Sequence, residues 1–245
     1  MGKTTTAVNL GTALAAVDKR VLVVDLDPQG NASTGLGIGS KRRSHNSYDV
    51  LVRETPVAAA AVDTPIPGLR IVPSSINLIG AEIELVEVER REFRLREALE
   101  RVRAAYDYML IDCPPSLNLS TLNALVAADA LLVPLQCEFY ALEGLSHLMH
   151  TIELVRRGFN PALEIQGVVL TMFDKRNNLC DQVAADVRGY FGDKVYETVI
   201  PRNVRVSEAP SHGKPVLLYD MRCAGSQAYI HLAGEVLRRE REHEP

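Results

Sequence analysis

The stretch GKTTTAVNL at residues 2–10 decides the fold, because it joins a Gly-Lys-Thr triplet to a helical pattern. Phosphate-binding loops read G-x-x-x-x-G-K-[ST] and connect a strand to a helix. Only the second half of that pattern is present here, with Met1 directly before it. Taken alone, the stretch is either half of a phosphate-binding loop that opens a helix over 4–17, or a chance triplet.

The composition is typical of a soluble globular protein. The 245 residues suffice for one large domain, and 47% of them are hydrophobic and 24% charged. The formal net charge is −4, so binding to nucleic acid would need a local basic patch. No apolar run approaches the roughly 20 residues that span a bilayer, and no signal-peptide pattern is present. The four cysteines form no C-x-x-C pair, which favours reduced thiols and a cytoplasmic protein.

Short apolar, β-branched runs alternate with helical patterns along the chain, and such runs are typical of parallel strands covered on both faces. The alternation predicts an α/β protein with three layers and a mostly parallel central sheet, in a single domain over 1–245. The expected strands are 20–27, 69–74, 106–115, 129–136, 164–173 and 194–200. The expected helices are 4–17, 76–105 with breaks, 119–128, 140–157, 179–191 and 224–242. The polar stretch 39–47 is expected to be a surface loop.

Acidic side chains follow two of the expected strands, at the end where ligands bind in open α/β sheets. Asp25 and Asp27 end one strand, and Asp112 ends another. A single Asp after an apolar strand is typical of a Walker B carboxylate, which holds Mg²⁺. For Asp25, the role of a helix cap or turn residue is as good an interpretation as a catalytic one.

The carboxylates at the strand ends support a phosphate-binding role for the Gly-Lys-Thr triplet. A helix N-terminus favours phosphate, so Lys3 would reach the β- and γ-phosphates of a nucleotide and the Thr4 hydroxyl would ligate Mg²⁺. The joint occurrence of GKTTT, DLDPQGN and IDCPPS favours the phosphate-binding interpretation over the chance triplet.

The chain resembles the ParA/Soj chromosome-partitioning ATPases, which belong to the MinD-like group of deviant-Walker P-loop proteins. The resemblance extends from residue 2 to about residue 237, and it implies a P-loop NTPase fold that uses ATP and Mg²⁺. The stretches that carry it are GKTTTAVNL, VLVVDLDPQGNAS, YDYMLIDCPPSL, LLVPLQCEFYALEGL, LTMFDKR and IPRNVRVSEAPSHGKPV.

The resemblance implies roles for the loop residues. Gly2, Lys3, Thr4 and Thr5 correspond to the nucleotide-binding half of the family's loop. In the family, the lysine at the position of Lys3 is catalytic and the hydroxyl at Thr4 ligates magnesium. The residue at Thr5 contacts the α-phosphate.

Roles outside the loop also follow from the resemblance. Asp27 matches the carboxylate that positions water for hydrolysis, and Asp112 matches the Walker B metal ligand. The PRN stretch resembles the segment that packs on adenine, so Pro201 and Asn203 are the expected base contacts.

The family binds DNA nonspecifically as an ATP-dependent homodimer, and a ParB-type partition protein stimulates its hydrolysis. This implies a cytoplasmic, nucleoid-associated protein that does not bind membrane. Arg176 and Arg205 match the DNA-contact positions. From the residues alone, the two basic clusters that contain Arg176 and Arg205 are more typical of ordinary solvated surface.

The chain departs from the family at its start. The family's loop reads KGGVGKTT and follows the first strand of the sheet, and this strand and the K-G-G are missing here. The missing lysine reaches the partner's nucleotide in the family, and the missing glycines supply backbone N–H groups for phosphate. We expect the neighbours of the missing strand to keep unpaired backbone groups, and we expect Met1 to mark a gene model that begins too far downstream.

Other interpretations remain. The chain could be a truncated, catalytically inactive module that binds DNA or a partner. A MinD-like membrane cycle would need a basic amphipathic C-terminal helix, but no bulky apolar residue follows Leu237. An iron–sulfur reductase would need paired cysteines, and Cys113 has no matching partner. His147 and His150 could belong to a metal site or lie on an ordinary helix surface. Cys113 could be a nucleophile or a small residue in a turn.

Overall fold

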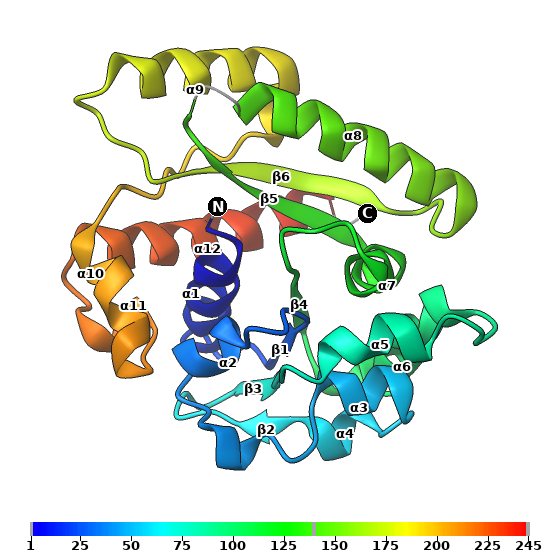
Figure 1. The fold of residues 1–245 in the computed structure, drawn as a ribbon. Coiled ribbons are helices and arrows are strands. Elements are labelled where there is room, and N and C mark those ends of the chain that lie inside the picture. The colour runs from blue at the N-terminus through cyan, green and yellow to red at the C-terminus, as the bar shows by residue number, and fades with distance from the viewer. Residues whose placement is uncertain (1, 139–140, 244–245) are drawn as a thin grey trace.

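The structure, a computed structural model, describes residues 2–138 and 141–243 (Figure 1). One sheet has the strand order β2-β3-β1-β4, in which β1, β3 and β4 are parallel and β2 is antiparallel at the edge. A second sheet contains β5 and β6 in parallel. The strands are β1 (Val21–Asp25), β2 (Val62–Asp63), β3 (Leu69–Val72), β4 (Tyr108–Asp112), β5 (Ala130–Gln136) and β6 (Glu164–Thr171). The predicted α/β fold with mostly parallel strands is confirmed.

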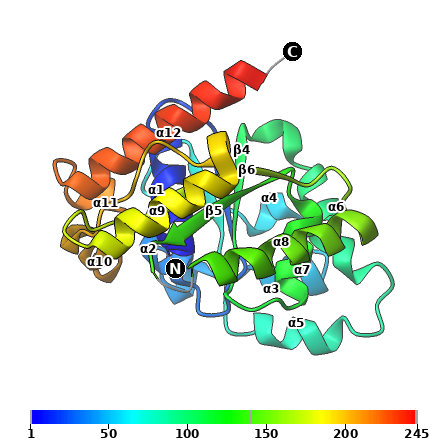
Figure 2. The ribbon, with the colours of Figure 1, turned by 90° about the horizontal axis from the view of Figure 1, so that it is seen from above.

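Helices cover both faces of the strands (Figure 2). The longer helices are α1 (Lys3–Ala15), α7 (Leu119–Ala127), α8 (Ala141–Gly158), α9 (Asn178–Phe191) and α12 (Ala224–His243). The shorter ones are α2 (Asn31–Gly35), α3 (Ser47–Val52), α4 (Val57–Ala60), α5 (Leu78–Glu84), α6 (Arg94–Glu100), α10 (Val204–Glu208) and α11 (Val216–Tyr219). Single 3₁₀ turns are η1 (Ser40–Arg42), η2 (Arg91–Phe93), η3 (Arg103–Ala105), η4 (Gly192–Lys194) and η5 (Ala209–His212). Residue 140, the expected start of the 140–157 helix, lies outside the described residues.

The strand β1 divides the hydrophobic core into two halves because successive side chains of a strand point to opposite faces. Val21 and Val23 pack in one cluster with α1 and α12. Leu22 and Val24 pack in the other, with α3, α5 and α6. All of β1 is buried, so a continuous apolar run forms the middle of three layers, as expected for a parallel strand.

The strands β4 and β5 each lack a partner on one edge. Among the described residues, β4 pairs only with β1, and β5 pairs only with β6. Most residues of both strands are half-buried, whereas those of β1 are fully buried. The helix α1 contacts both β4 and β5. Unpaired edges of this kind are expected where a sheet lacks a central strand.

The expected strand over 194–200 does not form. Val195 makes an isolated bridge to Val168, and Pro201 makes another to Phe173. Between these bridges, the N–H groups of Glu197 and Thr198 donate to the carboxylate of Glu235 on α12, at 2.8 and 2.9 Å. A buried side chain therefore takes the hydrogen bonds that a strand ladder would need.

The two unpaired edges generate a prediction. A strand added in parallel between β4 and β5 would pair with both edges and cover their half-buried faces. We expect a chain extended before residue 1 by an apolar β-branched strand and Lys-Gly-Gly to unfold at a midpoint at least about 5 °C higher than the 245-residue chain. Thermal unfolding followed by circular dichroism measures this. An extension of equal length with prolines in the strand is the control, and an equal rise with that control would contradict the pairing.

Candidate active site

The register of β1 against β4 brings two carboxylates together. Asp25 is paired with Asp112 in this parallel register, and the N–H of Leu26 donates to the carbonyl of Asp112 at 2.9 Å. Asp27 follows on the same edge, and its charge acts on Asp112. The carboxyl ends of the two strands thus form an acidic site from segments far apart in the sequence.

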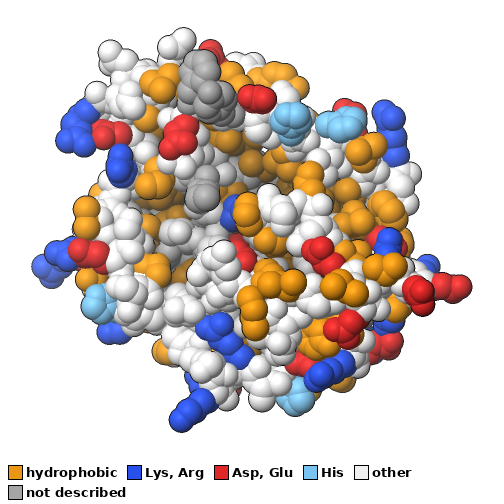
Figure 3. All heavy atoms as spheres, in the orientation of Figure 1, with side chains coloured by type: hydrophobic (Ala, Val, Ile, Leu, Met, Phe, Trp, Pro, Cys, Tyr) orange, Lys and Arg blue, Asp and Glu red, His pale blue; other side chains and the backbone are white. Residues whose placement is uncertain are grey.

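The start of α1 faces this acidic site. The Nζ of Lys3 donates to the carbonyl of Pro114 at 3.1 Å, just beyond Asp112. Figure 3 shows the molecule in the orientation of Figure 1, with all side chains drawn. The predicted loop residues and the predicted Walker B carboxylate therefore lie together.

Gly2 has a backbone conformation that suits glycine. Its φ is +112°, and a Cβ there would lie 3.3 Å from the Thr171 hydroxyl at the end of β6. The carbonyl of Gly2 accepts from the N–H of Thr6 at 2.8 Å and closes the first turn of α1. The N–H groups of that first turn precede the helical ladder, so they and the helix dipole are suited to an anion.

Asp112 is buried and its charge is poorly compensated. The residue is 2% exposed, and neither carboxylate oxygen has a hydrogen-bond partner within the described part of the chain. Burial first, and then the charge of Asp25, raise the pKa of Asp112 to about 7. The Thr4 hydroxyl and Lys3 lie close enough to oppose this rise. Buried carboxylate oxygens without donors, beside a hydroxyl, are a donor set that fits Mg²⁺.

Asp25 serves the local turn. Its carboxylate accepts from the N–H and hydroxyl of Ser33, at 2.8 and 2.7 Å, and from the N–H of Asp27 at 3.2 Å. Burial raises the pKa of Asp25, while the bonds from Ser33 act against that rise. These bonds support the interpretation of Asp25 as a turn residue that anchors α2.

Asp27 has a more open position. One carboxylate oxygen accepts from the N–H of Gln29 at 3.0 Å, and its carbonyl accepts from Gly30 at 2.8 Å. The side chain is only half-buried, so it borders the site without being enclosed by it.

Pro201 and Asn203 lie in the segment that passes the end of β6. Pro201 forms its bridge with Phe173, two residues beyond Thr171. The side chain of Asn203 caps α10 by accepting from the N–H of Arg205 at 2.9 Å.

The two arginines expected to contact DNA are bound to acidic residues of their own chain. Arg176 is 89% exposed at its side chain and pairs with Asp174 at 2.8 Å. Arg205 pairs with Glu208 at 2.9 Å and with Asp220 at 3.5 Å. Arg176 also holds the pKa of Asp174 down to about 2. Sequence reasoning missed these carboxylates, although Asp174 stands only two positions before Arg176.

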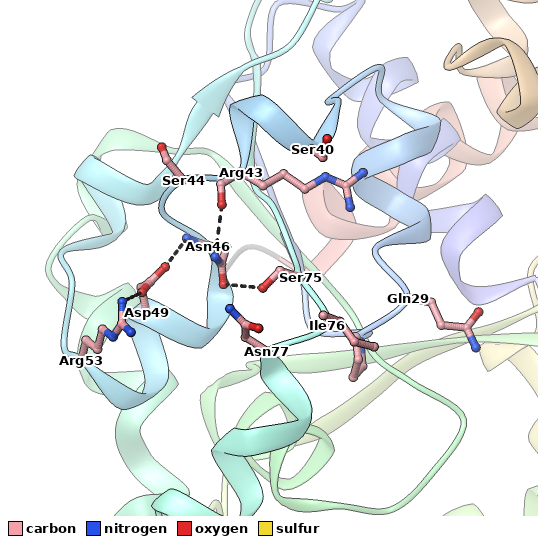
Figure 4. A pocket seen from close by; sticks show the side chains of 11 residues that line it. Gln29, Ser40, Arg43, Ser44, Asn46, Asp49, Arg53, Ser75, Ile76 and Asn77 are labelled. Carbon is pink, nitrogen blue, oxygen red and sulfur yellow. Dashed lines mark hydrogen bonds and ion pairs between the residues drawn. The ribbon is translucent and has the colours of Figure 1, made fainter.

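The stretch 39–47 is more ordered than a simple surface loop. Arg43 donates to the carbonyl of Ile38 at 2.8 Å, and Asn46 begins α3 with a capping box completed by Asp49. The Asn-x-x-Asp spacing was the signal that could have revealed this helix. Figure 4 shows these side chains around a hollow of about 520 Å³ beside Gln29.

The alternative sites find little support. His147 is exposed, with Glu143 4.0 Å away, and the described residues hold no group of three or more His, Cys, Asp or Glu that could bind a metal. Burial raises the pKa of the Cys113 thiol to about 12, which disfavours a nucleophilic thiolate. Within residues 2–138 and 141–243, no helix has the length and apolar character needed to cross a membrane.

Comparison with known proteins gives close matches over the whole chain. A family model described as an AAA domain matches residues 1–165. The chromosome partitioning protein ParA of Caulobacter vibrioides is 66% identical over 246 residues, which cover 100% of this chain and 92% of that protein. The sporulation initiation inhibitor protein Soj of Bacillus subtilis is 56% identical over 236 residues, covering 96% and 93%.

Solved structures show the same fold. Cobyrinic acid a,c-diamide synthase from Mycobacterium smegmatis, crystallised with ADP and magnesium, has a TM-score of 0.86 at 34% identity. The match covers 99% of this chain and 91% of that one. The cell division ATPase MinD of Pyrococcus furiosus has a TM-score of 0.80 at 25% identity, covering 97% and 93%.

The raised pKa of Asp112 predicts a stabilising substitution. Between the ordinary pKa of 3.8 and about 7, the folded chain holds a proton that the unfolded chain releases. The free energy of unfolding therefore falls as pH rises through this window. We expect Asp112→Asn to raise the free energy of unfolding of the ligand-free protein at pH 8 by about 2 kcal/mol. Urea unfolding at pH 4 and pH 8 measures the change.

Asp107 provides the control for this prediction. Arg20 holds the pKa of Asp107 down to about 2, so its contribution to stability is present above the ordinary value and lost in acid. Asp107→Asn should therefore lower stability at pH 8. If Asp112→Asn also lowers it there, burial does not disfavour the Asp112 carboxylate as argued.

Proposed function

Because the chain belongs to the ParA/Soj family of chromosome-partitioning proteins, we propose that it is an ATPase that acts in DNA partitioning. In this proposal, residues 1–245 act as one domain. One observation carries this proposal: the start of α1, with Lys3 and Thr4, faces the buried and poorly compensated carboxylate of Asp112.

The phosphates of ATP would bind at the N-terminus of α1. Gly2 and the first-turn N–H groups would contact them, and Thr5 would contact the α-phosphate. Lys3 would exchange its bond to the Pro114 carbonyl for the β- and γ-phosphates. The exchange costs little because one carbonyl acceptor is replaced by charged oxygens, which form stronger bonds.

The Thr4 hydroxyl and the Asp112 carboxylate would hold Mg²⁺, which neutralises phosphate charge when bound. Asp27 would orient the attacking water, since its carboxylate borders the site and is half-exposed. The Mycobacterium smegmatis structure, similar over 99% of this chain, contains ADP and magnesium, and this supports the assignment of ATP and Mg²⁺.

Pro201 and Asn203 are proposed as the contacts to adenine. Their segment is bridged to Phe173 beyond the end of β6, and Gly2 lies against Thr171 at that end. The proximity of both segments to β6 supports one nucleotide lying between them.

The cellular role follows the family. We propose that the ATP-bound chain forms a homodimer that binds double-stranded DNA without sequence preference, on the nucleoid in the cytoplasm. Arg176 and Arg205 would contact phosphates, and a ParB-type partition protein would stimulate hydrolysis. The exposure of both arginines supports this, although each must first leave its carboxylate partner.

Hydrolysis of ATP tests the proposal directly. We expect Lys3→Ala to lower kcat/KM at least about a hundredfold, because the main positive charge on the phosphates is lost. Asp27→Ala should lower kcat and leave KM nearly unchanged, because water is no longer oriented. Lys41→Ala, at an exposed position outside the site, is the control. Rates are measured with and without duplex DNA, by phosphate release. If the unaltered and strand-extended chains both fail to hydrolyse ATP, the inactive DNA- or partner-binding module becomes the better interpretation.

Because Arg176 is ion-paired with Asp174, substitutions of the two residues should have opposite effects on DNA binding. Arg176→Ala should weaken binding to random duplex DNA and reduce the slope of log K against log salt by about 1. Asp174→Asn should strengthen binding, since it frees Arg176 from its ion pair. Arg157→Ala and Glu153→Gln on α8 make matched charge changes elsewhere on the surface. Fluorescence anisotropy at several salt concentrations measures each variant, and equal effects from these controls would argue against an Arg176 contact.

A further inference from the structure

An apolar stripe lies exposed along α5 and the turns on either side of it. Ile76, Ile79, Ile83 and Val86 are 65, 57, 77 and 58% exposed. Their spacing of three and four residues places them on one side of a helix, over a length of about 15 Å. The N–H of Val86 donates to the carbonyl of Ile83, so helical turns continue past α5. Hydrophobic side chains with acidic ones between them gather over α5 in Figure 3.

The opposite side of α5 anchors the helix in the core. Leu78, Ala81 and Leu85 are at most 2% exposed, and they pack in the cluster shared with α3 and α6. The exposed stripe is therefore additional to the residues that hold α5 in place. A contiguous apolar surface of this kind marks an interaction site more often than isolated exposed residues do.

Glutamates border the stripe on both sides. On α5 itself, Glu82 flanks one side of the stripe and Glu84 flanks the other, and the exposed Glu87 and Glu89 follow in the turns after the helix. Glu84 accepts a hydrogen bond from the Tyr48 hydroxyl at 3.0 Å. In the described chain, none of these four glutamates forms an ion pair; the nearby arginines that could pair with them, Arg90 and Arg91, are paired with Glu97 and Glu92.

This pattern decides between two kinds of occupant. A second copy of the chain that docked stripe against stripe would bring the two sets of glutamates together, and like charges across an interface oppose association. The complementary surface is an apolar stripe with lysine or arginine on both sides, about three helical turns long. We propose that the α5 stripe binds a basic amphipathic helix of a partner protein. The binding requires neither ATP nor DNA, so it goes beyond the proposed function and does not depend on it.

A labelled 18-residue helical peptide of leucine and lysine, with its leucines on one face, is the probe. Fluorescence anisotropy against the full chain should show saturable binding. The double variant Ile79→Ser/Ile83→Ser should weaken binding about tenfold or more, because the central apolar contacts are lost. Leu154→Ser, at a 55% exposed position on α8, is the matched control and should bind the peptide as the unaltered chain does.

The glutamates beside the stripe can be tested separately from its apolar residues. Glu82→Gln/Glu89→Gln should weaken binding and flatten its dependence on salt, whereas Glu143→Gln/Glu153→Gln on α8 should change neither. Three results of the peptide assay would overturn the proposal: an equal loss of binding with Leu154→Ser, equally tight binding of a leucine and glutamate peptide, or no binding at all. If sedimentation shows self-association that the Ile79/Ile83 variant abolishes, the stripe instead binds a second copy.

ATP hydrolysis by the Ile79→Ser/Ile83→Ser variant separates this inference from the proposed function. Both side chains lie outside the candidate active site, so basal hydrolysis should equal that of the unaltered chain. Loss of peptide binding with unchanged hydrolysis supports the stripe, whatever the outcome of the ATPase assays on Lys3 and Asp27.

Discussion

The parallel pairing of β1 with β4 is the constraint on which the site depends. It sets Asp25 beside Asp112 and holds Leu26 against the Asp112 carbonyl. Because the side chains of β1 alternate between two cores, its register also fixes which helices cover each face. A slip of one residue would turn the core residues of β1 to the wrong faces and separate the carboxylates, so fold and site share one determinant.

The site is built at a cost to stability. Asp112 sits among groups that raise its pKa, and its oxygens have no donor within the described residues. The ammonium group of Lys3 donates to a neutral acceptor, the carbonyl of Pro114. This arrangement is typical of a ligand site, where the bound molecule supplies the compensation that the protein lacks. Asp25, with three donors, shows how a neighbouring buried carboxylate is satisfied when its role is structural.

The acidic residues of the surface have different roles in different places, which the overall composition does not show. The chain is acidic overall, and the exposed arginines expected to contact DNA are held by Asp174, Glu208 and Asp220. Around α5, by contrast, glutamates lack ion pairs in the described chain and border an apolar stripe. The same acidic excess therefore neutralises one surface and gives the other a net negative charge.

The sequence by itself determined the parallel strands and the longer helices. Apolar runs predicted β1, β3, β4, β5 and β6, and the GKTTT and IDCPPS stretches predicted residues that do meet, because strand ends in a parallel sheet share one edge. Only the tertiary structure decided that 194–200 is no regular strand, since Glu235 on the distant helix α12 accepts the N–H groups of Glu197 and Thr198. It also decided that Asp25 serves a turn and that Arg176 and Arg205 are ion-paired. These outcomes depend on which side chains lie close in space, and spacing along the chain does not specify that.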